Sequence, residues 1–482
     1  MKPLFFRTAP ALTAAVLLSA CSFMPTYERP AAPVAASFPD VSGATPPTIG
    51  TAADELDWAS FFTDARLRVL VDVALKNNRD LRVATLNVEQ VRAQLGIQRA
   101  ELYPSVGVGV QASSTPVGGA NQRTFTAGLS VTAFELDLFG RVRSLTKAAA
   151  ARYLASDEGR RAAQVALVSA VASTDLALRA DDALLALTQR TLDSRAEAFK
   201  LVQLRFDGGV SAEPELRSAQ SLQAAARVTL AALQRQRAQN LNALVLLLGQ
   251  GLPADLPPAT GLPNLPDVPV GVPSEVLLQR PDIRAAEQQL IAANANIGAA
   301  RSAFFPRISL TGNAGFASNE LGSLFENVAW SFTGQLLQPL FDAGRNRANL
   351  AAAQAGRDVA VAQYEGAIQA AFREVADALA GRATLGEQLA AQQVQADAET
   401  RRLKLAELLY EGGVSNALER LDAERASLAA QQAVVQLQLA QRLNAVQLYS
   451  ALGGGAGPGL AMPLAARSAT PLAANSGQAS AR

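Results

Sequence analysis

The chain repeats itself at an interval of 202 to 204 residues, and this repetition limits the folds open to it. Residues 93–104 (AQLGIQRAELYP) and 295–306 (ANIGAARSAFFP) share Ala, Gly, Arg and Pro at a spacing of 202. FDGGVS at 206–211 returns as YEGGVS at 410–415, at a spacing of 204. Because the matching blocks keep their order, we interpret the chain as two copies of one structural unit.

Composition shifts mark the boundaries of the two copies. We expect the first repeat at 58–250 and the second at 274–452, joined by the Pro-rich segment 251–273, which proline keeps extended. The segment 21–57 is also rich in proline and is predicted to be an extended N-terminal arm. The Gly-, Ala- and Ser-rich tail 453–482 is predicted to be disordered.

The first 20 residues read as a lipoprotein signal peptide. Lys2 and Arg7 precede a ten-residue apolar core, and small residues then lead to Cys21. This pattern resembles a bacterial lipobox, so Cys21 is predicted to carry a covalent lipid anchor, with Ser22 permitting outer-membrane sorting. The alternative is an ordinary secretory signal with an incidental cysteine.

Two segments in each repeat have the alternation of membrane β-strands. Residues 124–133 and 307–316 alternate apolar with small or polar side chains, and 105–113 and 329–337 do so more weakly. Four strands are too few to close a membrane barrel, and open edges cannot face lipid, so the barrel must be shared between two or more chains. Two hairpins of a soluble sheet are the alternative.

The loops between these strands differ in length, which accounts for the change in repeat spacing. Nine residues, 115–123, are expected between the first pair of strands, and eleven, 317–327, between the second pair. Insertions of this kind are tolerated in surface loops.

Long helices account for the rest of each repeat. Residues 141–207 and 345–411 each contain 67 residues without a proline, a length of roughly 100 Å as a helix. Helices near 213–249 and 416–452 are expected to return from the GGVS turns. Two further helices, near 64–101 and 274–303, are expected to lead into the strands.

The composition excludes several classes of function. The chain has no histidine, a single cysteine and a net charge of +1. The commonest general base and metal ligand is therefore missing, and nothing suggests nucleic-acid binding. No phosphate-binding loop or serine nucleophile motif is present. We expect no enzymatic activity and no cofactor other than the lipid on Cys21.

The chain resembles the TolC-like outer-membrane factors, and among them the lipoproteins related to OprM and NodT. The resemblance covers nearly the whole mature chain, and QRPDIRAAE is its most specific motif. The residues that carry it are LSAC at 18–21, DWASFFTDARL at 57–67, QRPDIRAAE at 279–287, FFPRISL at 304–310, FDAGR at 341–345 and the two GGVS turns.

This resemblance implies a mainly α fold with a transmembrane β-barrel. Three chains would share a 12-stranded barrel, continued by a long α-helical periplasmic barrel with an equatorial belt. The implied function is the outer-membrane exit channel of a tripartite efflux pump, passively conducting small toxic compounds from periplasm to exterior. The implied partners are a periplasmic adaptor and an inner-membrane RND transporter.

Two other functions stay open on the sequence. An exit duct for type I protein secretion shares the fold, although the lipobox and the QRPDIRAAE motif favour efflux. A lipid-anchored coiled-coil scaffold without a pore would explain the helices but not the strand pairs.

The GGVS turns are predicted to lie at the periplasmic tip and to dock the adaptor, as the resemblance implies. Paired glycines permit the positive φ that a tight reversal between helices needs. The alternative is that they only cap helices. The docking residues predicted are Gly208, Gly209, Val210, Ser211, Gly412, Gly413, Val414 and Ser415.

A periplasmic gate is predicted beside the second tip, at Tyr410, Glu419 and Asp422. Ser415, Glu419 and Asp422 are spaced to share one helical face, and threefold symmetry would turn each acidic residue into a ring of carboxylates. The resemblance implies that Tyr410 and Asp422 build the constriction. A solvated acidic helix face is the alternative.

Overall fold

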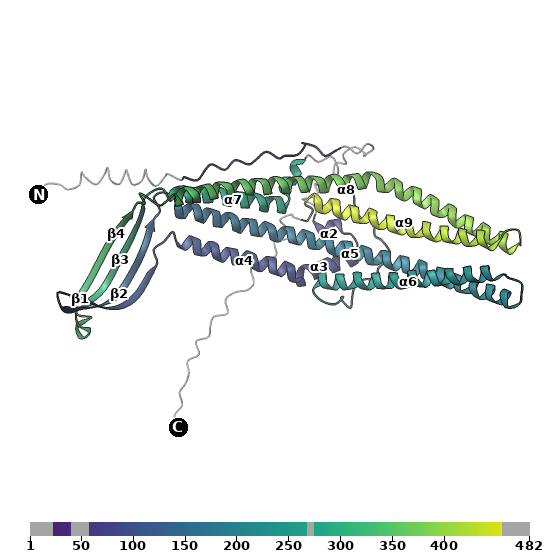
Figure 1. Cartoon of the computed structure of the whole chain (residues 1–482), viewed down its shortest axis with the longest axis horizontal. Coiled ribbons are helices and arrows are strands. Elements are labelled where there is room, and N and C mark those ends of the chain that lie inside the picture. The colour runs from purple at the N-terminus through teal and green to yellow at the C-terminus, as the bar shows by residue number, and fades with distance from the viewer. Residues whose placement is uncertain (1–22, 40–56, 268–273, 456–482) are drawn as a thin grey trace, which may run out of the picture.

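A four-stranded sheet lies at one end of the molecule and two helical hairpins lie at the other (Figure 1). The computed structural model describes residues 23–39, 57–267 and 274–455. The predicted signal peptide, Cys21 and most of the predicted tail lie outside these residues. Within the described part, no helix is long and apolar enough to cross a membrane.

The two repeats share the order helix, strand, strand, 67-residue helix, helix, and differ in the short elements before and between these. The first contains α2 (Trp58–Phe61), α3 (Ala65–Asn77), α4 (Arg79–Ala100), β1 (Val106–Val117), β2 (Ala120–Leu136), α5 (Arg141–Asp207) and α6 (Glu213–Leu248). The second contains η2 (Ser274–Gln279), α7 (Pro281–Ser302), β3 (Arg307–Ser318), η3 (Leu321–Ser323), β4 (Val328–Leu337), α8 (Arg345–Glu411) and α9 (Ala417–Ala451). Helices α5 and α8 fill the two proline-free stretches, each with 67 residues.

Two helices predicted to be continuous are broken. The prediction over 64–101 is wrong at Asn78, whose extended backbone ends α3 and whose side chain accepts a hydrogen bond from Leu81 N–H to cap α4. The prediction over 274–303 is wrong at Arg280, which is extended because Pro281 follows it and begins α7.

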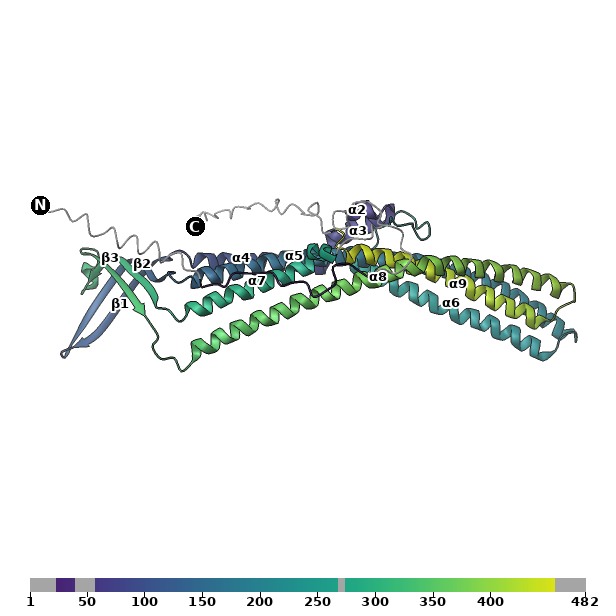
Figure 2. The same ribbon diagram turned by 90° about the horizontal axis from the view of Figure 1, so that it is seen from above.

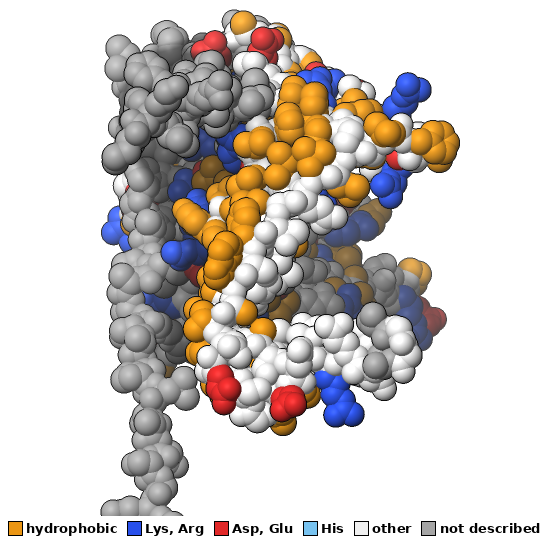
Figure 3. Space-filling model, turned by 90° about the vertical axis from the view of Figure 1, so that its left-hand side faces the viewer, with side chains coloured by type: hydrophobic (Ala, Val, Ile, Leu, Met, Phe, Trp, Pro, Cys, Tyr) orange, Lys and Arg blue, Asp and Glu red, His pale blue; other side chains and the backbone are white. Residues whose placement is uncertain are grey.

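The sheet is antiparallel in the order β1-β2-β3-β4, and its two faces differ in chemistry. One face carries apolar rows such as Val108, Leu129, Ala314 and Trp330, and the other carries small or polar rows such as Gly107, Ser130, Asn313 and Ser331. Viewed from the sheet end, hydrophobic side chains form a band along the strands (Figure 3). This is the two-faced pattern of a wall between lipid and water.

The prediction of a nine-residue loop over 115–123 is wrong. β1 and β2 stay paired as far as Val117 and Ala120, so only Gly118 and Gly119 turn the chain. Both glycines have positive φ, of 59° and 88°, which suits the right-handed twist of a two-residue hairpin. The sequence showed a polar, Gly-rich segment but not that its flanks pair.

A β-bulge in β2 changes which face of the sheet its last residues occupy. The pairing with β3 shifts by one residue between Val131 and Phe134, and Ala133 has a φ of 50°. Without the shift, Glu135 would share the apolar face, because side chains alternate along a strand. With it, the Glu135 carboxylate pairs with Arg141 at 2.8 Å and with Arg307 at 3.2 Å.

The main core lies between the sheet and the hairpin tips, where α2, α3, the linker and the end of α9 surround α5 and α8 (Figures 1 and 2). Phe61 stacks on Tyr449 with ring centroids 4.1 Å apart. Gly454 donates its N–H to the Tyr449 carbonyl, and residues 453–455 are buried. The disorder predicted from 453 is therefore wrong for these three residues.

A buried ionic network fastens the linker to this core. The Arg179 guanidinium pairs with Asp175 at 2.7 Å and with Asp64 at 2.8 Å, and it donates to the Gly261 carbonyl. Arg66 pairs with Asp175 and donates to the Pro257 carbonyl. Burial alone would raise the pKa of Asp64, but hydrogen bonds from Arg179 and from Leu67 N–H outweigh it and lower that pKa.

Two glycines let β2 and β3 approach closely on the polar face. Gly128 stands opposite Gly315, and a Cβ added at Gly315 would lie 2.5 Å from Gly128 Cα and collide with the Ala127 carbonyl. At Gly312, three residues away on the apolar face, an added Cβ would meet only the Ser331 oxygen at 3.9 Å.

We therefore predict that Gly315→Val disrupts the sheet whereas Gly312→Val does not. The first change forces side-chain atoms into the β2 backbone, a cost of at least about 1–3 kcal/mol. Urea unfolding of the purified protein in a Trp58→Phe background, followed by the fluorescence of Trp330, measures the difference. Equal midpoints for the two variants would contradict the close approach.

Candidate functional site

The same turn closes both hairpins at the end of the molecule farthest from the sheet (Figure 1). Gly209 and Gly413 each have a φ of 73°. The Val210 N–H donates to the Arg205 carbonyl at 2.8 Å, and the Val414 N–H donates to the Leu409 carbonyl at 2.9 Å. These are the bonds of a Schellman cap, which needs a left-handed residue just after the helix.

The second half of each turn repeats as well. The Ser211 hydroxyl donates to the Glu215 carboxylate at 2.6 Å, and the Ser415 hydroxyl donates to the Glu419 carboxylate. Asn416 caps α9 by accepting the Glu419 N–H at 3.0 Å. Ser415 therefore precedes the helix, and the prediction that it shares a helical face with Glu419 and Asp422 is wrong.

Apolar side chains project from both tips. Val210 is 80% exposed and Val414 is 78% exposed. Each valine follows directly on the left-handed glycine, so the turn itself directs it outwards. The docking residues predicted from the sequence thus lie together in two tips that have the same backbone bonds.

Tyr410 of the second hairpin is tied to the first. Its hydroxyl accepts a hydrogen bond from Arg205 at 2.8 Å and donates one to Glu215 at 3.2 Å. The Arg420 guanidinium lies 5.2 Å from the centre of the tyrosine ring. The sequence placed Tyr410 at the gate but did not identify these partners, because Arg205 and Glu215 are about two hundred residues away.

Asp422 has other partners. Its carboxylate lies 3.5 Å from Arg402 on α8 and 3.8 Å from Arg425 on α9, and the side chain is 60% exposed. Glu419 accepts from Ser415 and its own backbone is capped by Asn416. The three predicted gate residues therefore stand near one tip, each in a different local network.

A buried ion pair that sequence reasoning missed joins the two hairpins above the tips. Arg195 of α5 pairs with Glu424 of α9 at 2.7 Å, and both side chains are almost fully buried. Arg195 also donates to the Leu222 carbonyl on α6 at 3.1 Å. No spacing rule could have paired residues 229 positions apart. The one feature of the sequence that could have indicated this pair is a charged residue on the apolar face of each helix.

At the opposite end, the N-terminal arm lies along α7. Phe23 stacks on Phe305 with centroids 4.4 Å apart, at the junction of sheet and helices. Farther along, Glu287 of α7 accepts from Arg29 at 2.7 Å and from the Tyr27 hydroxyl at 2.9 Å. Burial and the Glu287 carboxylate both raise the pKa of Tyr27, which keeps its hydroxyl a donor.

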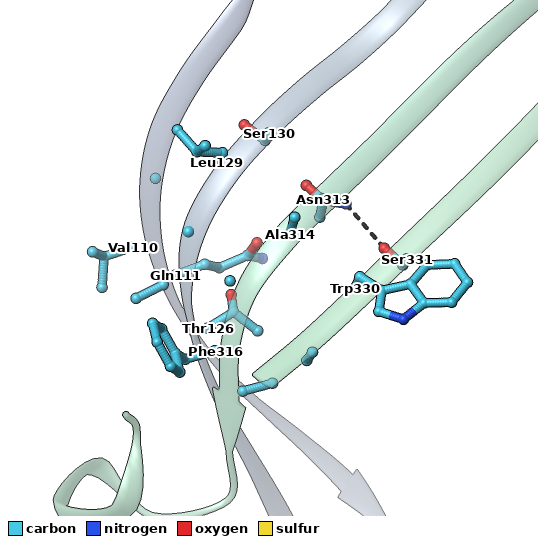
Figure 4. A pocket seen from close by; sticks show the side chains of 16 residues that line it. Val110, Gln111, Thr126, Leu129, Ser130, Asn313, Ala314, Phe316, Trp330 and Ser331 are labelled. Carbon is cyan, nitrogen blue, oxygen red and sulfur yellow. Dashed lines mark hydrogen bonds between the residues drawn. The ribbon is translucent and has the colours of Figure 1, made fainter. Parts of the chain in front are cut away.

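The curved sheet borders an open hollow of about 650 Å³. Its polar lining includes Gln111, Thr126 and Ser130, and Asn313 donates to the Ser331 hydroxyl at 3.2 Å across β3 and β4 (Figure 4). The part of the chain that the structure describes holds no group of three or more acidic or sulfur side chains that could bind a metal. The lining combines these polar side chains with apolar ones such as Val110 and Trp330.

These features define an outer-membrane channel protein. A short sheet with one apolar and one polar face continues into long helices, and the helices end in two matching tips. The chain belongs to the outer membrane efflux protein family, because residues 70–250 and 272–454 match the sequence pattern of that family.

Relatives and solved structures agree with this family. The chain is 46% identical to outer membrane protein OprJ of Pseudomonas aeruginosa, covering 94% of this chain and 96% of OprJ. It is 45% identical to the solvent efflux pump outer membrane protein SrpC of Pseudomonas putida, covering 93% and 98%. The open-state MtrE channel of Neisseria gonorrhoeae superposes with a TM-score of 0.82 at 40% identity, covering 90% and 99%.

The resemblance to TolC-like outer-membrane factors is thus confirmed. CusC, another channel of this kind, superposes with a TM-score of 0.80 at 40% identity. The mainly helical fold with a small sheet is confirmed as well, and the protein is located in the outer membrane as its relatives are.

Proposed function

We propose that the chain is one third of the exit channel of an RND-type tripartite efflux pump, conducting small toxic compounds passively to the exterior. The observation that carries this is the two-faced sheet with β1 and β4 as unpaired edges. Three copies would close it as twelve strands with apolar side chains towards lipid and polar ones towards water. The solvent and antibiotic efflux pumps named among the relatives support efflux over protein secretion.

The hairpin tips would form the resting gate. The hydrogen bonds from Tyr410 to Arg205 and Glu215 hold the two hairpins of one chain together. The Arg195–Glu424 ion pair does the same farther from the tips. Around a threefold axis, Glu419 and Asp422 would each make a ring of three carboxylates. Like charges held close favour cations at a constriction.

We predict that the double variant Glu419→Ala, Asp422→Ala conducts more and selects cations less. The change removes the carboxylates of both rings together with the Ser415 and Arg402 contacts that restrain the tip. Single-channel recording in planar bilayers measures both quantities. Glu213→Ala, an exposed carboxylate of the first hairpin paired only with Arg217 among the described residues, is the control.

Unchanged conductance and selectivity in the double variant would refute the gate. A wild-type protein that inserts but never conducts would refute the channel as well.

The exposed tips would dock the periplasmic adaptor. Their supporting features are the matching caps and the projecting Val210 and Val414. Two alike tips per chain would offer six similar docking places in a trimer.

We predict that Gly413→Val prevents cross-linking to the adaptor while trimers still form. A β-branched residue is strained at the positive φ of Gly413, so the tip must change shape. Gly386→Val is the control, because Gly386 lies inside α8 away from the tip and an added Cβ there meets nothing within 4 Å. Cross-linking in intact cells measures docking. A Gly413→Val protein that cross-links normally would count against the docking site.

We also propose that Cys21 carries the lipid anchor. Phe23 sits at the junction of sheet and helices, and two residues span at most about 7 Å. A lipid on Cys21 would therefore enter the membrane at the level where the sheet ends.

We predict that cells fed a radioactive fatty acid label the wild type and Ser22→Ala but not Cys21→Ala. The thiol is the only sulfhydryl in the chain, so no other residue can form the thioether. Autoradiography of the immunoprecipitated protein reads the result. Fatty-acid label on the Cys21→Ala variant would show that the lipid is not attached at this position.

A further inference from the structure

At each of the four places where a strand meets a helix, an aromatic residue and an arginine stand four residues apart. The aromatic residue is on the sheet side in every case, and the arginine lies farther along the helix. The pairs are Tyr103 with Arg99 on α4, Phe139 with Arg143 on α5, Phe305 with Arg301 on α7, and Phe341 with Arg345 on α8. Helices α4 and α7 run towards the sheet, whereas α5 and α8 run away from it (Figure 1). The shared order therefore follows from position in space and not from repetition of one sequence motif.

The junction between sheet and helices carries an excess of positive charge. It holds eight basic and four acidic residues, whereas the net charge of the whole chain is only +1. The junction consists of residues 97–104, 135–147, 299–307 and 338–347.

Most of the acidic residues in the junction already have partners. Glu135 pairs with Arg141 and Arg307, and Asp137 pairs with Arg143. Other arginines of the junction form no ion pair with any residue that the structure describes. These four, which we call the arginine collar, are Arg99, Arg301, Arg345 and Arg347.

The collar reaches the outer side of the helices, which the N-terminal arm covers. On α7, Asn294 donates to the Pro25 carbonyl at 2.9 Å, and Arg301 donates to the Phe23 carbonyl at 3.3 Å. Arg301 therefore lies on the same side of α7 as the arm that leads to the proposed lipid anchor.

The other two helices of the collar present an arginine on this side as well. Arg99 is the counterpart of Arg301 at the 202-residue spacing, and it is exposed on α4. Arg345 and Arg347 are both exposed on α8. Residues two positions apart point to opposite sides of a helix, so one of these two arginines faces outwards.

The distance from the aromatic residues to the collar matches the polar layer of a bilayer. Tyr103 and Phe341 are exposed at the foot of the sheet, where aromatic rings mark the edge of a hydrocarbon layer. Four residues at the helical rise place the arginines about 6 Å farther on. The headgroup region on each side of the hydrocarbon is also roughly 5–7 Å thick. Rings at the edge of the hydrocarbon thus put the guanidinium groups at the level of lipid phosphates.

We propose that the arginine collar binds the phosphate groups of anionic phospholipids in the periplasmic leaflet of the outer membrane. The guanidinium fork donates two parallel hydrogen bonds to phosphate oxygens, and clustered basic side chains favour a surface of net negative charge. The inference rests on the proposed channel, whose sheet spans the membrane with the hairpin tips in the periplasm.

The collar is tested by reconstituting the purified full chain into vesicles of equal parts phosphatidylglycerol and phosphatidylethanolamine. Both lipids carry a phosphate, but only the first has a net negative charge. Mass spectrometry measures the lipid that stays with the protein after mild detergent extraction. We expect wild type to retain severalfold more phosphatidylglycerol than phosphatidylethanolamine. We expect the triple variant Arg99→Gln, Arg345→Gln, Arg347→Gln to retain the two lipids in nearly equal amounts.

A matched control removes three arginines from the hairpins instead. Arg227→Gln, Arg235→Gln, Arg401→Gln changes the net charge equally, at exposed residues far from the sheet, and should keep the preference of wild type. Arg99→Gln alone should lower the preference part of the way. Because Arg99 is exposed and has no ion pair among the described residues, this single variant still tests the collar if the triple variant folds poorly.

The outcomes separate the collar from the channel. Equal retention of both lipids by wild type, or an undiminished preference in the triple and single variants, would overturn the collar. A preference lost equally in the hairpin control would do so too, because the overall charge would then be its cause. Loss of the bound lipid on adding an equimolar amount of inorganic phosphate would show that the ligand is a free anion and not a headgroup. Wild-type protein that conducts without preferring either lipid leaves the channel standing, whereas wild type that never conducts refutes the channel itself.

Discussion

A peptide group in hydrocarbon must have its hydrogen bonds satisfied by protein, and the architecture of this chain follows from that requirement. Each chain brings four strands, and the sequence alternates so that apolar side chains face one way and small or polar ones the other. Such a sheet has two open edges, and only a closed ring removes them. The helices start from the ends of the strands. The circumference of the proposed closed barrel would therefore set how the helices are arranged.

Much of this arrangement could be predicted from the sequence because its causes are local. Alternation predicted the strands, and the lack of proline predicted both 67-residue helices. The break at Asn78 was missed because it depends on tertiary packing: the Asn78 amide donates to the Leu247 carbonyl. The bulge at Ala133 was missed because it is a relation between two strands.

In the candidate site, too, features with local causes could be predicted and features that depend on distant residues could not. The two glycine turns could be predicted as reversals, since a repeated GG pair between long helices has few other uses. The partners of Tyr410 could not, because a hydrogen bond across about two hundred residues leaves no mark in the local sequence. Ser415 was placed on α9 by counting residues, but Asn416 is the better cap and begins the helix one residue later.

The N-terminal arm occurs once, whereas the strands and the long helices of the chain occur twice. It lies over the groove between α5 and α7, where Met24 is within 3 Å of the position a Gly298 side chain would take. In an assembly of three chains, three of six nearly equivalent grooves would therefore be filled and three left open. In the proposed channel the arm would lower the symmetry of the outer wall from sixfold to threefold, so any protein that encircles the channel at this height would meet two alternating kinds of surface.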